Sequence, residues 1–105
     1  AEKIAKFKII PIKNILAANP QNTDRERVII AGVVSTIKKS VTRQGQPMIF
    51  AKLADYDSTM EVIVFSDALA AQPNAWKENN VLAVSGRLSW RNNEPKIICD
   101  KAIEL

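Results

Sequence analysis

The stretch from Arg27 to Phe65 constrains the fold of this 105-residue chain more than any other part of it. Valine, isoleucine and other apolar residues recur there with the period of two that is typical of half-buried β-strands. The first run, VIIAGVV, is β-branched and contains a glycine, which disfavours a helix. We therefore predict three consecutive strands, at residues 27–41, 47–55 and 59–65.

The second and third of these strands each have an apolar face and a mixed face, because successive side chains of a strand point to opposite sides. The predicted core face carries Ile49, Ala51, Leu53, Met60, Val62 and Val64. The opposite face carries Met48, Phe50, Lys52, Thr59, Glu61, Ile63 and Phe65. Since charged residues are seldom buried, we predict that this second face meets solvent or a ligand.

The C-terminal part of the chain supplies two further strands, predicted at residues 81–90 and 95–105. A hairpin turn containing two consecutive asparagines connects them. A short helix over residues 67–71, with Ser66 as its N-cap, connects the third strand to the fourth. Trp76, which follows this helix, is predicted to close one end of the core.

Five strands in this order, with a helix between the third and the fourth, match the OB-fold, an all-β Greek-key barrel. An SH3-like barrel is the main alternative, but it rarely has a helix at that position. Gly32 indicates a bulge or sharp bend in the long first strand, and Gly86 another bend in the fourth. We assign residues 1–26 to a lead-in segment with a short helix at 12–18 and a loop, and residues 27–105 to the barrel.

The composition argues against catalysis. The chain has no histidine and one cysteine, Cys99, so neither an internal disulfide nor a zinc cluster is possible. The acidic residues are scattered, and the three glycines are too far apart for a phosphate-binding loop. We predict no catalytic residue, no metal and no cofactor, with Cys99 as a buried apolar residue in a reducing cytoplasm. No apolar run is long enough for a membrane span.

Positive charge is concentrated on the first two strands. Residues 27–55 carry five basic residues and one acid, whereas residues 56–80 carry one basic residue and four acids. An OB barrel binds oligonucleotides with the face of strands 2 and 3 and with the loops 1–2 and 4–5. The candidate binding residues are Lys38, Lys39 and Arg43 in loop 1–2, Phe50, Lys52, Glu61 and Ile63 on the face, Arg87 on strand four, and Trp90 and Arg91 at loop 4–5.

These residues suggest a generic mechanism for single-stranded nucleic acid. A base stacks on Phe50 or Trp90, while lysine and arginine side chains pair with phosphates and release counterions. Other interpretations stay open. The lysines of loop 1–2 also fit a solvated loop, Trp90 also fits a cover for the barrel rim, and Phe50 with Ile63 and Phe65 also fits a protein-docking patch.

Several short motifs carry a resemblance to a known family: Gly32 with its flanking valines, PMIF at 47–50, MEVIVF at 60–65, VSGR at 84–87 and IICDKA at 97–102. Over about residues 12–105 the chain resembles the OB-fold domain late in the alpha subunit of bacterial DNA polymerase III. OB domains of class II aminoacyl-tRNA synthetases share part of the pattern, with an aromatic at the position of Phe50 that stacks on an anticodon base. The chain departs from both at 57–59, where Asp-Ser-Thr replaces the usual glycine.

The resemblance implies a non-catalytic module that binds single-stranded DNA, in the cytoplasm and near the nucleoid of a bacterium. It is either a domain of a replicative polymerase alpha subunit or a small protein derived from one. The implied partners are single-stranded DNA and other domains of the polymerase or replisome proteins, with no membrane. An RNA-binding module of the anticodon type and a protein-interaction domain are the alternatives.

Overall fold

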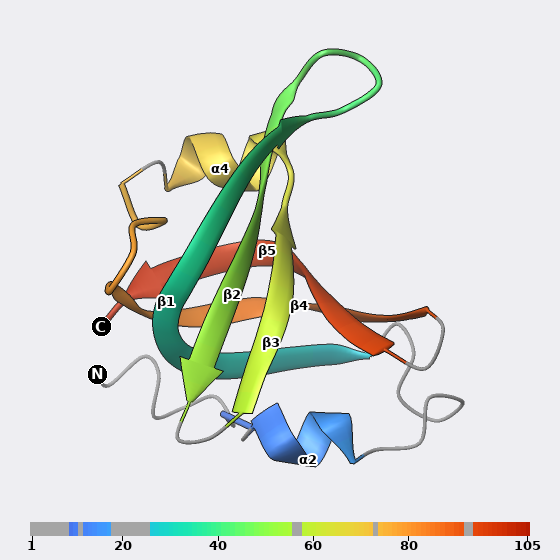
Figure 1. Ribbon diagram of the computed structural model, residues 1–105, viewed down its shortest axis with the longest axis vertical. Helices are drawn as coiled ribbons and strands as arrows, with labels where there is room; N and C mark the ends of the chain where they lie inside the picture. The colour runs from blue at the N-terminus through green and yellow to red at the C-terminus, as the bar shows by residue number, and fades with distance from the viewer. Residues whose placement is uncertain (1–8, 11, 18–25, 56–57, 73, 92–93) are drawn as a thin grey trace.

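The computed structural model describes residues 9–10, 12–17, 26–55, 58–72, 74–91 and 94–105, with the side chain of Arg91 excepted (Figure 1). The elements are α2 (Ile12–Leu16), β1 (Arg27–Val41), β2 (Pro47–Asp55), β3 (Ser58–Val64), α4 (Ser66–Ala71), β4 (Val81–Arg91) and β5 (Glu94–Glu104). The predicted loop before β1 lies outside the described residues, apart from Glu26. The same holds for Asn92 and Asn93 of the predicted hairpin turn.

The five strands form a closed barrel in the order β1-β2-β3-β5-β4. The β3–β5 pair is parallel and the other pairs are antiparallel. β1 pairs with β4 through its first half and with β2 through its second half, and Figure 1 shows the strand turning sharply between the two. The predicted OB-fold, with a helix between strands 3 and 4 and a short N-terminal helix, is confirmed.

The bend in β1 combines a glycine with a bulge three residues later. A Cβ on Gly32 would lie 2.6 Å from the carbonyl oxygen of Ala54, so only glycine allows β2 to approach this closely. The register with β2 shifts between Val34 and Thr36, which makes Ser35 the extra residue. The sequence therefore predicted the bend correctly, but the bulge lies at Ser35 rather than at Gly32.

The prediction that Ser66 is an N-cap is wrong by one residue. Ser66 is the first helical residue of α4, and Phe65 occupies the N-cap position with extended backbone and no side-chain cap. The reason is that β3 ends at Val64, so the carbonyl of Phe65 is free to accept the N–H of Leu69 at 2.9 Å. The first backbone hydrogen bond of α4 therefore starts at Phe65, and no side chain caps the helix there.

The predicted core face of β2 and β3 is buried. Each of its six residues is at most 4% exposed, and Trp76 joins the same cluster at 6% exposure. Met48, predicted on the opposite face, is also buried, at 8% exposure. α2 lies across the end of the barrel next to β2 and β3, with Ile12 and Ile15 buried in the core (Figure 1).

Asp55, the last residue of β2, attaches α2 to the barrel. Its Oδ2 accepts the backbone N–H of Ile12 at 2.9 Å, one of the N–H groups that a helix start leaves unpaired. We expect Asp55→Ala to lower the free energy of unfolding by about 1 kcal/mol, as measured by urea denaturation. Glu104→Ala, at an exposed site on β5, is the control and should have no measurable effect. Equal stability of the two variants would contradict this role for Asp55.

Candidate nucleic-acid interface

Strand register places two rows of side chains across the outside of the barrel. The first, the aromatic row, runs over β1, β2, β3 and β5 through Lys38, Phe50, Ile63 and Ile98. The second, the charged row, contains Thr36, Lys52, Glu61 and Lys96. Because the rows are two residues apart along each strand, they are separated by about 6.6 Å.

A groove of about 550 Å³ lies over these rows. It is lined by Thr36, Ile37, Lys38, Phe50, Lys52, Glu61 and Lys96. Three lysines and one glutamate give it a net charge of +2. The ring of Phe50 is half-buried, whereas Lys38 and Lys52 are exposed. The groove therefore offers an apolar ring with one cation directly across from it on β1 and another two residues along β2.

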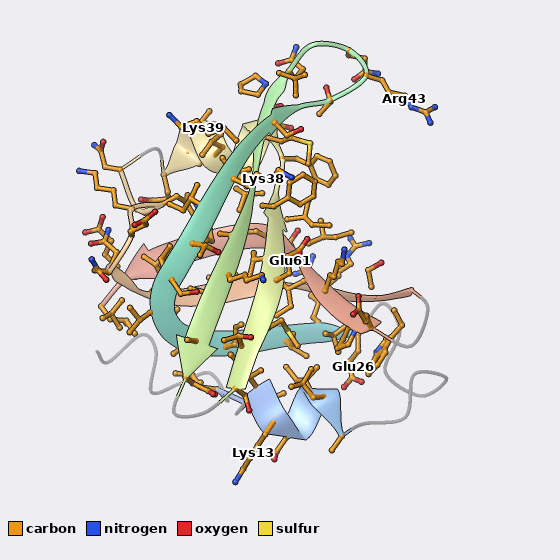
Figure 2. The ribbon with its side chains drawn as sticks, in the orientation of Figure 1. Lys13, Glu26, Lys38, Lys39, Arg43 and Glu61 are labelled. Carbon is orange, nitrogen blue, oxygen red and sulfur yellow. The ribbon has the colours of Figure 1, made fainter. Side chains whose placement is uncertain are left out.

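Four of the predicted site residues meet in the groove: Lys38, Phe50, Lys52 and Glu61. Ile63, directly opposite Phe50 on β3, is half-buried beside it. Figure 2 shows Lys38 and Glu61 over the β1–β3 face, with Arg43 well away from them at the tip of the β1–β2 turn.

Lys38 and Lys39 lie in the first strand, as its predicted bounds imply, and their placement in loop 1–2 is wrong. Both belong to β1 and pair with Phe50 and Ile49 of β2, and only residues 42–46 form the turn. Adjacent residues of a strand point to opposite faces, so the two lysines diverge. Lys38 enters the groove, whereas Figure 2 shows Lys39 on the side of α4.

The remaining predicted residues lie on β4, outside the groove. Arg87 is exposed and pairs with Arg27 of β1 and Ile98 of β5. Trp90, predicted as the last residue of strand four and counted among the residues of loop 4–5, lies within β4 and packs half-buried against the core. Arg91 ends the strand, and its side chain lies outside the described residues.

Sequence reasoning missed Lys96, whose Nζ lies 3.4 Å from Oε1 of Glu61. The alternation of β5 puts Lys96 on the outer surface, and this much was visible in the sequence. Its proximity to Glu61 was not visible, because it depends on the parallel pairing of β3 with β5. Thr36 was missed for a related reason, since the bulge at Ser35 decides which face it occupies.

The charge of the groove is suited to holding an anion. Among the described residues no group of histidine, cysteine, aspartate and glutamate is placed to hold a metal ion. Cys99 is buried, and this burial, reinforced by the nearby charge of Asp100, raises the pKa of its thiol to about 12. The protonated thiol is a poor nucleophile at neutral pH.

No helix among the described residues is long and apolar enough to cross a membrane.

The half-buried Phe50 and the exposed lysines lie on the outer surface that OB barrels use to bind oligonucleotides. Residues 28–105 match the family of OB-fold nucleic acid binding domains. The chain belongs to this family.

The polymerase resemblance seen in the sequence is confirmed. The chain is 26% identical over 88 residues to the DNA polymerase III subunit alpha of Saccharopolyspora erythraea, covering 84% of this chain. It is 28% identical over 86 residues to that of Halalkalibacterium halodurans, covering 81% of this chain. It spans only 7% and 8% of the length of these two relatives.

Solved structures share the fold at low sequence identity. An aspartyl-tRNA synthetase from Leishmania major has a TM-score of 0.71 at 15% identity, over 93% of this chain and 20% of that one. A mitochondrial single-stranded DNA binding protein of S. cerevisiae has a TM-score of 0.62 at 11% identity, over 79% of this chain and 97% of that one.

Proposed function

We propose that this domain binds single-stranded DNA in the groove, as an accessory module of a bacterial replicative DNA polymerase alpha subunit or of a related small protein. The observation that carries the proposal is the half-buried ring of Phe50 with the exposed Lys38 and Lys52 next to it in one groove. A base stacks on the ring, and the lysines contact the adjacent phosphates. In the relatives, the matching segment is part of a DNA polymerase subunit, which favours DNA over RNA.

The geometry favours a single strand over a duplex. In a duplex the bases are stacked on one another, so their faces are not available to Phe50. The groove offers few groups that read base edges, since its polar side chains are mainly lysines. We therefore infer weak sequence preference and an affinity dominated by phosphate contacts, which falls with salt.

Fluorescence anisotropy with labelled oligo-dT tests the proposal, at salt concentrations of about 50 and about 200 mM. The expected result is binding that weakens with salt. The logarithm of the association constant should fall linearly with the logarithm of the salt concentration, with a slope of about 0.7 for each phosphate contacted. Competition with unlabelled oligo-rU and with a DNA hairpin duplex compares ligand classes. Oligo-dT should bind more tightly than either. No binding at the lower salt rejects the function, and tighter binding of oligo-rU points to the RNA alternative.

Lys38 and Lys39 provide a matched pair of variants, because they carry the same charge at adjacent positions. We expect Lys38→Gln to weaken oligo-dT binding and to lower the salt slope by about 0.7, since one phosphate contact is lost. Lys39→Gln removes the same charge on the opposite face and should change the slope much less. Equal effects of the two variants would mean that net charge, rather than the groove, governs binding.

A further inference from the structure

Glu61 is the one acid among the groove-lining residues that the structure describes. It lies directly opposite Lys52 of β2, and its Oε1 is 3.4 Å from Nζ of Lys96 on β5. The side chains of Lys96 and Glu61 are 33% and 29% exposed, so the pair is open to solvent and to a ligand. Such an exposed pair adds little to stability. Stability therefore does not account for an acid in a groove whose other charged side chains are lysines.

We propose that Lys96 is a phosphate-binding residue and that Glu61 is its resident competitor, displaced when a phosphodiester enters the groove. The inference rests on the proposed function. A carboxylate and a phosphodiester each carry one negative charge and accept hydrogen bonds from an ammonium group, so one can replace the other on Lys96. No covalent bond changes in this exchange.

The position of Lys96 supports the exchange. It is the β5 member of the charged row, which also contains Lys52 and lies beside the aromatic row with Phe50. A strand with a base on Phe50 and a phosphate at Lys52 would therefore extend toward Lys96. In the free protein Glu61 already neutralises Lys96, so the pair adds no net charge that would release counterions from the nucleic acid. Removing the carboxylate leaves Lys96 free to neutralise a phosphate and to release the counterions condensed there.

The test uses four variants of the whole chain and labelled oligo-dT. We expect Glu61→Gln to bind about two- to fivefold more tightly than the wild type, the range of an exposed ion pair, and to raise the salt slope by about 0.7. Lys96→Gln should bind more weakly than the wild type, because Glu61 then repels phosphate unopposed. The double variant should return close to wild-type affinity. Glu104→Gln, the same charge change at an exposed site on β5, should not tighten binding comparably.

Three outcomes would overturn the exchange while the wild type still binds oligo-dT. One is unchanged or weaker binding by Glu61→Gln. If the same variant is then titrated with oligo-dC and loses affinity for that probe alone, Glu61 is a contact to the cytosine amino group. Another is a double variant that binds as tightly as Glu61→Gln alone, because the gain would then not depend on Lys96. The third is an equal gain in Glu104→Gln, which would reflect net charge alone. If the wild type does not bind oligo-dT, the proposed function itself fails and the exchange fails with it.

Discussion

Phe50→Ala is expected to weaken oligo-dT binding by about 5- to 150-fold, which corresponds to the 1–3 kcal/mol that stacking of one base contributes. The ring is half-buried in the groove with Ile63 opposite it on β3, so it is held in place before the ligand arrives. Little side-chain freedom is lost on binding, and the stacking energy is largely retained. Anisotropy titrations at low salt measure the change.

The control is Phe65→Ala, which removes an equally large ring from an exposed position outside the groove. Phe65 is 43% exposed and occupies the N-cap position of α4, outside the groove. We expect no measurable change in oligo-dT affinity for this variant, and unfolding curves should show that both proteins remain folded. Comparable losses for the two variants would assign the effect to general surface hydrophobicity and would reject Phe50 as the stacking platform.

Gly86→Ala is expected to lower the free energy of unfolding by about 3 kcal/mol or more, the upper end of what overpacking costs. A Cβ at this position would overlap the carbonyl oxygen of Ile98 and lie 2.7 Å from Cγ2 of Ile97. The oxygen belongs to the backbone of β5, so it cannot rotate away. Relief requires β5 to move, at the point where its register with β4 already shifts between Ser85 and Gly86.

Gly45→Ala is the matched control, because it adds the same methyl group in open space. Gly45 lies in the β1–β2 turn with a φ of +81°, and no atom lies within 4 Å of the added Cβ. Its cost should be about 1–2 kcal/mol, from the left-handed backbone alone. Urea denaturation of both variants separates the two causes. A Gly86→Ala protein as stable as Gly45→Ala would show that β4 and β5 are less tightly packed than described.

Much of the barrel could be predicted from local pattern. The bounds of β1 and β2 agree with the prediction, because the alternation of apolar residues and the polar turn between them are local signals. The core positions follow from the same alternation, and Leu53 and Val62 are fully buried as expected. The exposed faces of Phe50 and Lys52 follow as well, since a strand with one buried face presents the other face outward.

The composition of the groove was only partly predictable. Lys38 and Lys39 were both predicted as binding residues because they are adjacent in sequence. Both lie in a strand, where adjacent side chains point to opposite faces. Trp90 was predicted at the junction of strand four and loop 4–5, and it lies inside β4 because the pairing with β5 extends to Arg91 and Glu94. In both places the number of paired residues decided whether a residue lies in a strand or in a loop. That number depends on the partner strand.

The sequence by itself determined that this chain forms an OB barrel with an aromatic and basic outer face, because burial of alternating side chains is a local property of each strand. Only the tertiary structure decided that Lys96 lies against Glu61. These residues are far apart in the chain, and they meet because β3 and β5 close the barrel in parallel. The physical reason is that parallel pairing sets register through long-range packing, with no turn between the strands to fix it in the sequence.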